Sequence, residues 1–286
     1  MRVVAVGGGH GLATTLRAAR LYAEELTAVV SVADDGGSSG RLREIAGIPA
    51  PGDLRRCLVA MAAEGSQWAE AFEYRFPTGS GDLEGHALGN LIIAGLANVT
   101  GDFGLSLDRV GELLGVVGRV LPATSVPVVL KAEVAGQEVV GQVAVSKTGG
   151  IITSVSIVPP DAPVPDAAIR AIAEADQVIL GPGSLYTSVL AAAAVPGIRD
   201  VLSERRSGRI YVCNLRPQLP ETSGFGEEDH LRAVLDHGVP VDVMVAGSPH
   251  GIDRLLGVPV VRAPLARSDG GGHEPAKLAD LLRRLT

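Results

Sequence analysis

The feature that most constrains the fold is the junction between an apolar run, residues 28–30, and the polar stretch that follows it. That stretch, residues 31–41, reads Ser-Val-Ala-Asp-Asp-Gly-Gly-Ser-Ser-Gly-Arg. Asp34 and Asp35 would lie at the carboxyl end of a buried strand, where a parallel α/β sheet opens its ligand crevice. The two glycines after them let the backbone turn and approach a ligand closely. The junction therefore predicts an α/β fold with a ligand pocket at this point.

The same stretch has a simpler interpretation, an Asp-Gly turn followed by a capped helix. Its two serines could cap that helix or bond a ligand oxygen. A turn usually needs one or two such residues, whereas this stretch has seven. We therefore favour the pocket. Its candidate ligand contacts are Asp34, Asp35, Gly36, Ser38 and Ser39.

A second ligand-binding feature lies at the start of the chain. Residues 3–6 are typical of a buried strand, Gly-Gly-Gly-His-Gly follows, and residues 12–25 have the pattern of an amphipathic helix. This order presents free N–H groups and the positive end of a helix to a phosphate. The spacing fits neither G-x-G-x-x-G nor the P-loop, so it does not predict ordinary NAD or ATP chemistry. The predicted phosphate contacts are Gly8, Gly9, His10 and Gly11.

Some of the polar residues have two interpretations. His10 could support the turn or contact a ligand. Asp53 could be a helix N-cap or a third carboxylate for a sugar hydroxyl or a magnesium ion. Asn90 could cap an apolar helix over residues 91–99 or bind a ligand, and His86 lies on a polar loop before that helix. Asp34 and Asp35 are the candidates for holding Mg²⁺.

The second half of the chain repeats the order of strand, glycine turn and helix start. Residues 177–180 are the expected strand, and Gly-Pro-Gly-Ser-Leu-Tyr-Thr-Ser follows at residues 181–188. This predicts a second anion site; it is not the G-x-S-x-G elbow, so no nucleophile is expected. Asn214 follows a further strand, residues 210–213. The candidate contacts are Gly181, Gly183, Ser184, Thr187 and Asn214, and no residue is assigned a catalytic role.

Between the two halves the pattern changes to β-rich runs separated by turn signals, over residues 126–158. Runs at 127–134, 138–145 and 151–157 predict an antiparallel excursion. It is expected to be a lobe or an interface. The pattern on either side of it predicts an α/β fold with a mainly parallel sheet flanked by helices.

Composition excludes several classes of function. The net charge is -7 and only 3% of the residues are aromatic, which argues against a nucleic-acid partner. Two cysteines, Cys57 and Cys213, provide neither a disulfide framework nor a thiolate zinc site. No signal-peptide pattern and no stretch long enough to span a membrane is evident. We expect a cytoplasmic protein.

Taken together, these motifs resemble the YvcK family of gluconeogenesis factors, which is related in fold to 2-phospho-L-lactate transferase (CofD). The resemblance runs from the first glycine turn to the last helix. The motifs are Val-Ala-Asp-Asp-Gly-Gly-Ser-Ser-Gly-Arg-Leu-Arg (32–43), Pro-Gly-Asp-Leu-Arg (51–55), Gly-His-x-x-Gly-Asn-Leu (85–91), Gly-Pro-Gly-Ser-Leu-Tyr-Thr-Ser (181–188), and Glu221-Thr222 with His230. The chain departs from the family pattern at His10, in the helix at 189–195 and at 216–222, which bears on ligand choice.

The resemblance implies a Rossmann-like, CofD-type fold that forms a single domain over residues 1–286, and binding of UDP-sugars such as UDP-N-acetylglucosamine. It also implies a role in cell shape and peptidoglycan precursor supply during gluconeogenic growth. The chain is then a nucleotide-sugar-binding regulator, and homo-oligomerisation is left open. The alternative is a magnesium-dependent CofD-like transferase, with Asp34, Asp35 and Asp53 around the metal and His86 as a base.

Overall fold

Strands and helices alternate along most of the chain in the computed structural model, which describes residues 1–285. The strands are β1 (Arg2–Gly7), β2 (Glu25–Val30), β3 (Arg119–Pro122), β4 (Val129–Val134), β5 (Gln137–Val140), β6 (Ile152–Val158), β7 (Gln177–Leu180), β8 (Arg209–Val212), β9 (Val243–Ala246), β10 (Arg254–Leu255) and β11 (Val258–Arg262). The α-helices are α1 (Gly9–Ala19), α2 (Gly37–Ala46), α3 (Gly52–Met61), α4 (Gln67–Glu73), α5 (Leu88–Thr100), α6 (Phe103–Leu114), α7 (Gln142–Lys147), α8 (Asp166–Glu174), α9 (Leu190–Ala193), α10 (Pro196–Glu204), α11 (Glu227–Asp236) and α12 (Pro275–Leu282). A 3₁₀ turn, η1 (Gly81–Leu83), and a π-helical turn, η2 (Leu185–Val189), complete the elements.

The main sheet has the strand order β10-β11-β9-β8-β7-β1-β2-β3. All neighbours pair in parallel except β10 with β11. From β1 the chain moves to β2 and β3 on one side, whereas from β7 it moves to β8 and β9 on the other. The strand order therefore reverses between β1 and β7, and a ligand crevice is expected outside their carboxyl ends.

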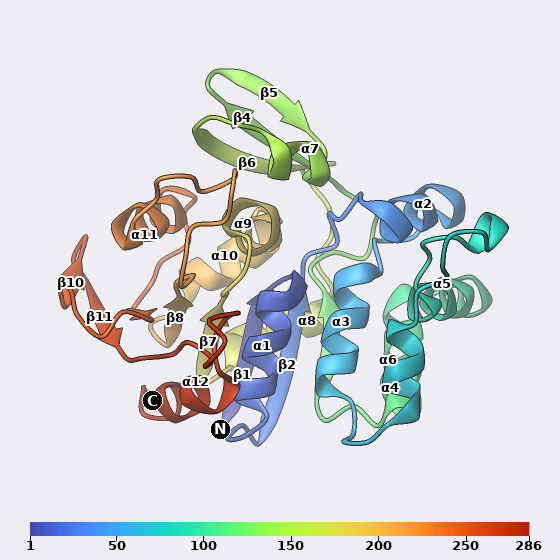
Figure 1. Cartoon of the computed structure of the whole chain (residues 1–286), viewed down its shortest axis with the longest axis horizontal. Helices are drawn as coiled ribbons and strands as arrows, with labels where there is room; N and C mark the ends of the chain where they lie inside the picture. Colours follow the sequence, from blue (N-terminus) through green and yellow to red (C-terminus); the bar gives the residue numbers. More distant parts are fainter. Residues whose placement is uncertain (286) are drawn as a thin grey trace.

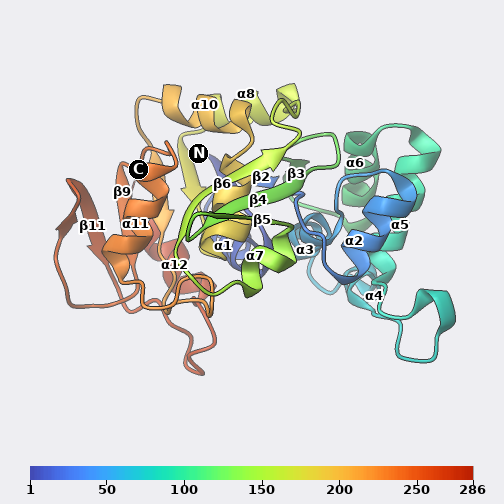
Figure 2. The same ribbon diagram turned by 90° about the horizontal axis from the view of Figure 1, so that it is seen from above.

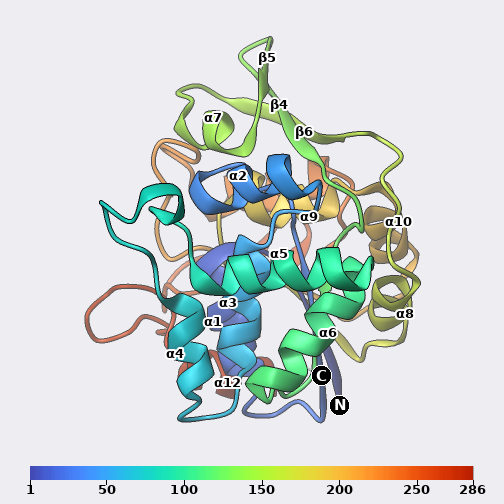
Figure 3. The ribbon, with the colours of Figure 1, turned by 90° about the vertical axis from the view of Figure 1, so that its right-hand side faces the viewer.

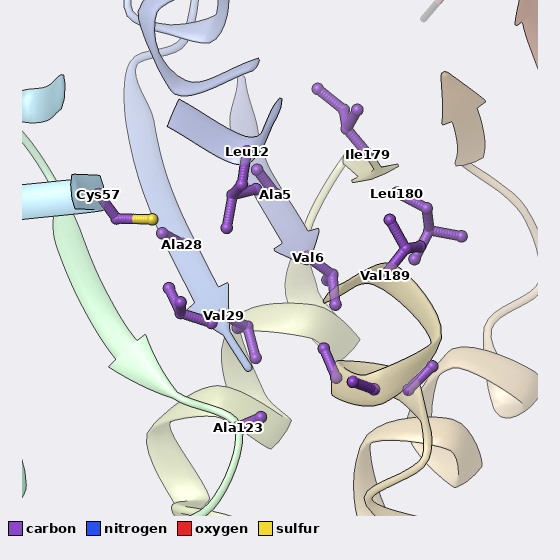
Figure 4. Packing of buried hydrophobic residues seen from close by; sticks show 14 of the residues in the cluster. Ala5, Val6, Leu12, Ala28, Val29, Cys57, Ala123, Ile179, Leu180 and Val189 are labelled. Atoms are coloured by element: carbon purple, nitrogen blue, oxygen red, sulfur yellow. The ribbon is translucent and has the colours of Figure 1, made fainter. Parts of the chain in front are cut away.

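The core of the sheet is made of small and branched apolar side chains. Strands β7 and β8 are buried along their whole length, as expected for parallel strands covered on both faces. Figure 4 shows Leu12 of α1 over Ala5 and, on the other side of the strand, Val6 near Val189. This packing fixes the start of α1 against the sheet, so the glycine turn before it is held on a rigid support.

Helices cover both faces of the sheet. Figure 2 shows α8 and α10 along one face and α1 with α12 on the opposite face. Helix α3 packs beside α1 against β2 and β3, and α4 to α6 lie on the same side of the molecule as β3 (Figure 2). Both chain termini lie at the end of the sheet away from the carboxyl ends of β1 and β2 (Figure 1).

A second sheet, with the strand order β5-β4-β6, is antiparallel. This lobe lies above α2 and α9, on the side of the carboxyl ends of the main strands (Figures 1 and 3). The predicted antiparallel excursion over 126–158 is confirmed, and so is the mainly parallel α/β fold. The expected strand over 138–145 was wrong in its second half, because residues 142–147 form α7.

Two expected element boundaries were also wrong. The first helix does not run over residues 12–25; it begins at Gly9 and ends at Ala19. It stops there because the N–H groups of Glu24 and Glu25 donate to the carbonyl of Met1, which starts β2 beside β1. The strand before the acidic stretch consequently begins at Glu25 and not at Ala28.

The described residues contain no single helix that is long and apolar enough to cross a membrane. One pair of consecutive helical segments, Leu185–Ala193 and Pro196–Glu204, reaches the required length and composition only together, and the two are bent by 76°.

Candidate functional site

The predicted phosphate turn lines a cavity of about 310 Å³ outside the carboxyl ends of β1 and β7, which we call the glycine-turn cavity. It brings together residues from distant parts of the chain. Its lining residues are Gly8, Gly9, His10, Gly11, Asp34, Asp53, Arg56, Gln142, Gly183, Ser184, Ser188 and Gln218. Eight of the sixteen ligand contacts predicted from the sequence are among them: Gly8, Gly9, His10, Gly11, Asp34, Asp53, Gly183 and Ser184.

The carboxylate of Asp53 contacts the backbone of the first glycine turn. It accepts a hydrogen bond from the backbone of Gly9, and a Cβ at Gly8 would lie 2.5 Å from its Oδ2. Arg56 donates to its Oδ1 at 2.5 Å. Burial, and secondarily the nearby Asp34, raises the pKa of Asp53 against the opposing effect of Arg56. Asp53 is not the cap of α3, whose N-cap is Pro51, so the cap interpretation was wrong.

The two glycine turns are in direct contact. A Cβ at Gly11 would lie 2.2 Å from the carbonyl oxygen of Pro182, so only glycine lets the turns approach this closely. His10 lies in the cavity wall, and burial and the nearby Arg56 lower its pKa, which favours the neutral imidazole. Since a neutral ring can both donate and accept, His10 can meet a ligand without adding charge.

The two adjacent carboxylates diverge. Asp34 lines the glycine-turn cavity, and its Oδ1 accepts the N–H of Gly36 at 2.9 Å. Asp35 turns toward the lobe, where its Oδ1 accepts the N–H of Val143 at 2.9 Å. Asp35 therefore anchors α7, and Gln142 beside it reaches the cavity wall.

The three carboxylates Asp34, Asp35 and Asp53 are held by different partners. Asp35 is engaged with the lobe and Asp53 with Arg56, whereas Asp34 accepts the N–H of Gly36 within its own turn. Among the described residues, no group of three or more His, Cys, Asp or Glu side chains is placed to hold a metal ion. Magnesium in proteins commonly uses one or two carboxylates together with substrate phosphates, so at most Asp34 fits such a shared ion.

The second glycine turn already contains a bound carboxylate, that of Glu221. Glu221 Oε1 accepts the N–H groups of Tyr186 and Thr187 at 2.6 and 3.2 Å, and its Oε2 accepts the Thr187 hydroxyl at 2.9 Å. Glu221 is buried, and it comes from a loop 35 residues away. The anion-binding geometry that the sequence predicts is thus present, but a side chain of the protein fills it.

Asn214 holds the same turn in place. Its Oδ1 accepts the N–H of Gly183 at 3.0 Å, and its Nδ2 donates to the carbonyl of Gly183 at 2.8 Å. This pair of bonds occupies the side-chain amide that the sequence offers to a ligand. Ser184 remains in the wall of the glycine-turn cavity, whereas Gly181 and Thr187 are not among its lining residues.

Beyond Asp34, a second cavity of about 250 Å³ opens over the start of α2, which we call the arginine cavity. It is lined by Asp34, Gly36, Gly37, Ser38, Ser39, Gly52, Arg55, Arg56, Arg75 and Asn90. The two serines do not cap α2, whose N-cap is Gly36, and Asn90 does not cap α5, whose N-cap is Ala87. Both cap interpretations were therefore wrong.

Three polar side chains form a buried network at this cavity. Asn90 Nδ2 donates to Ser38 Oγ at 3.0 Å, and Ser38 Oγ lies 3.0 Å from His86 Nδ1. Burial, with the nearby Arg41 and Arg75, lowers the pKa of His86. The motifs around 38 and 85–91 are thus brought together by packing of α2 on α5.

A third cavity, of about 440 Å³, adjoins the glycine-turn cavity and shares His10, Gly11, Gly183 and Gln218 with it. We call it the His273 cavity. It is lined in addition by Thr14, Pro182, Asn214, Leu215, Arg216, Pro217, Gly270, Gly271, Gly272 and His273. His273 is not among the contacts predicted from the sequence, although a histidine directly after three glycines is a signal that the sequence contains.

The contacts of His273 leave its Nε2 atom as a hydrogen-bond acceptor. Its ring is hydrogen-bonded to the backbone of Cys213, and its Nε2 is buried without a partner in the described structure. Burial lowers the pKa of His273 to about 4. A neutral ring that donates from Nδ1 to a carbonyl keeps a lone pair on Nε2.

The strand order and the three adjoining cavities define an α/β protein with an open ligand crevice at the switch point of its sheet. A family model described as 2-phospho-L-lactate transferase CofD matches residues 3–258. The chain therefore belongs to the CofD family, and the resemblance to its YvcK branch is confirmed.

Relatives and solved structures agree with this assignment. A protein named gluconeogenesis factor from Halalkalibacterium halodurans is 42% identical over 86% of this chain and 78% of its own length. A Nostoc relative is 45% identical over 82% of this chain, which spans about half (51%) of that protein. The crystal structure of a UPF0052 family member from Bacillus halodurans has a TM-score of 0.91 and 35% identity, with 98% of each chain covered.

Removal of the Glu221 carboxylate should destabilise the second turn. Glu221→Ala leaves two N–H groups and one hydroxyl without their acceptor, and we expect a loss of about 2–4 kcal/mol in the free energy of unfolding. Chemical denaturation measures this change in the free energy of unfolding. Glu228→Ala is the matched control, because its ion pair with Arg232 is half-exposed and contributes below about 0.5 kcal/mol. Equal effects of the two variants would contradict the structural role of Glu221.

His273 should make the fold sensitive to acid. The unfolded chain binds a proton on this residue near pH 6.5 and the folded chain only near pH 4, so stability falls as pH drops through this window. The loss should reach about 3 kcal/mol. Unfolding curves of the wild type and His273→Gln between pH 7 and pH 4 should diverge, with the shallower slope in the variant. Parallel slopes would contradict the buried neutral state.

Proposed function

We propose that this protein binds a nucleotide-sugar of the UDP-N-acetylglucosamine type in the crevice formed by the three cavities. The observation that carries the proposal is their continuity: one wall, from His273 past the glycine turn to Asp34, joins them. A nucleotide-sugar has three consecutive parts, a nucleoside, a diphosphate and a sugar. The crevice has three consecutive environments that suit them.

The diphosphate would lie on the first glycine turn. The N–H groups in the first turn of an α-helix have no partner within the helix, and the helix dipole adds a positive end. At the start of α1, Asp53 takes the N–H of Gly9, so His10 and Gly11 present theirs to the cavity. Arg56 supplies the nearby positive charge.

The nucleoside would occupy the His273 cavity, the largest of the three. Its apolar wall includes Leu215, Pro182 and Pro217, which suits the face of a base. The acceptor Nε2 of His273 favours a base edge that carries an N–H, as uracil does at N3. Cytosine has an acceptor at that position. A uridine nucleotide is therefore favoured over a cytidine nucleotide.

The sugar would face Asp34. Its carboxylate lies where the glycine-turn cavity meets the arginine cavity, beyond the phosphate position, and can accept hydrogen bonds from sugar hydroxyls. Asp35, directed into the lobe, would make no ligand contact of its own. The structure thus separates two residues that the sequence presents as a pair.

The names of the relatives support the gluconeogenic part of the proposed biological role. Proteins named gluconeogenesis factor, from Bacillus subtilis among others, cover most of this chain. We propose a cytoplasmic, single-domain regulator that reports nucleotide-sugar supply to cell-wall precursor synthesis and cell shape during gluconeogenic growth. Binding alone suffices for this role, since a ligand can shift the population of one protein state over another.

The binding test compares two carboxylates in one experiment. UDP-N-acetylglucosamine should raise the melting temperature of the wild type, because the ligand binds the folded state. Asp34→Asn should weaken binding by about 1–3 kcal/mol, or roughly 5- to 150-fold, as measured by calorimetry. Asp35→Asn is the matched control and should change the affinity by less than about threefold. Absence of a shift with UDP-sugars, together with a clear shift with GTP or NAD, would refute the proposal.

One observation favours the transferase alternative: the arginine cavity could receive an anionic acceptor beside the nucleotide. A regulator and a transferase differ in turnover, because contacts equal in the ground and transition states give no acceleration. We expect that the protein with magnesium and UDP-N-acetylglucosamine leaves the ligand intact over hours. GTP with 2-phospholactate or phosphoenolpyruvate should likewise give no product. Steady product formation that is lost in Asp34→Asn would establish the enzyme.

A further inference from the structure

Helix α5 has no charged residue, although one of its faces is turned to solvent. It lies across the side of the molecule that faces the viewer in Figure 3, with α2 above it. Its inner face packs on α2, α3, α4 and α6 and consists of the buried residues Gly89, Asn90, Ile93, Ala94 and Ala97. A surface helix typically has charged and polar side chains opposite its buried face, so α5 is an exception.

The outer face of α5 consists of apolar residues and one asparagine. Opposite the buried residues lie Leu88, Leu91, Ile92, Gly95, Asn98 and Val99, which we call the α5 face. Val99 is 85% exposed, Gly95 and Asn98 are also exposed, and the other three residues are partly exposed. Apolar residues that are contiguous on a surface mark a contact with another molecule.

The polar side chains at the C-terminal end of α5 bond to their own helix. Asn98 Nδ2 donates to the carbonyl of Ala94 at 2.9 Å, and Thr100 Oγ1 donates to the carbonyl of Leu96 at 2.8 Å. Such bonds engage donors that would otherwise bind water. They therefore make this end of the helix less polar than its sequence suggests.

Gly95, in the middle of the α5 face, is not required by the fold of the chain. Its φ is not in the left-handed region, and no described heavy atom outside its own helix lies within 4 Å of the position of a Cβ. At Gly89, on the inner face, a Cβ would instead collide with the ring of Phe72. Glycine destabilises a helix interior relative to alanine, and its benefit is that another backbone can approach closely. At Gly95 that backbone is not part of this chain.

We propose that the α5 face joins two copies of this chain about a two-fold axis, with the two α5 helices crossing at Gly95. In such a contact the same patch of both copies meets, so each Gly95 lies against Gly95 of the partner subunit. Ile92 and Val99 pack on the two sides of this crossing. Each copy has a net charge of -7, and a face without charges is the surface on which two identical chains meet with the least repulsion.

A second copy fits the α5 face better than a membrane does. Helices that lie in a bilayer surface are rich in Lys and Arg on their polar side, whereas α5 has neither and the chain is acidic. The size of the face determines the strength of the contact. A helix of 13 residues is roughly 20 Å long, so a crossing of two such helices buries less than the roughly 800 Å² per partner of a standard interface. We therefore expect a dissociation constant in the micromolar range.

The experiment measures the molar mass of the full chain by sedimentation equilibrium, at protein concentrations between about 1 and 200 μM. The mass of the wild type should rise from that of a monomer to that of a dimer. Val99→Glu should weaken the association about tenfold or more, because each carboxylate would be desolvated in the contact. Val117→Glu is the matched control, since Val117 is 57% exposed and lies outside the α5 face, and it should associate as the wild type does.

Gly95→Gln separates the role of the contact from a role in folding. Glutamine is a better helix former than glycine, so the melting temperature of the variant should rise at low protein concentration. Its side chain would lie between the two backbones, so the association should weaken about tenfold or more. A variant that is more stable and yet less associated is the result expected of a glycine retained for a partner.

Three results would overturn the proposal. One is a wild type that stays monomeric up to about 200 μM. Another is equal association of the wild type, Val99→Glu and Gly95→Gln. The third is a monomeric wild type that floats with vesicles of phosphatidylcholine and phosphatidylserine while Val99→Glu does not, because a membrane would then be the occupant of the α5 face.

Discussion

The close contact between the two glycine turns is the constraint on which the crevice depends. At Gly11 a single added carbon would lie 2.2 Å from the Pro182 carbonyl oxygen, so α1 and the turn after β7 meet backbone to backbone. Parallel pairing of β1 with β7 brings both turns to the same edge of the sheet. Any side chain there would force them apart and would open the wall shared by the glycine-turn and His273 cavities.

Neighbouring residues in the sequence do not necessarily share a role in the fold. Asp34 faces the crevice, whereas Asp35 accepts the Val143 N–H and ties the antiparallel lobe to the main sheet. At the second turn, Glu221 satisfies N–H groups that a ligand would otherwise occupy. A strand, a glycine turn and a helix start therefore indicate an anion site, but the sequence does not reveal whether the anion is a ligand or a buried side chain.

The fold and the first turn could be predicted because their signals are local. The buried strand 177–180 matches β7, and the glycines at 8, 9 and 11 line the cavity as expected. Glu221, Arg75 and His273 were not among the predicted contacts, because their positions depend on contacts between distant segments. The boundary between α1 and β2 was missed for the same reason: it is set by the carbonyl of Met1, across the sheet from the helix pattern.

The distribution of charge along the crevice gives its three parts different preferences. Around the glycine turn, Asp53 pairs with Arg56, so the backbone and α1 provide much of the attraction for an anion. In the arginine cavity, Arg55 pairs with Glu73. The Glu73 carboxylate is half-exposed, so water screens its charge. The stronger uncompensated positive charge is therefore in the arginine cavity. An electrostatic gradient along the crevice would orient a ligand with unequal charge at its ends, and Asp34, at the junction, would oppose an anion that moved from one part to the other.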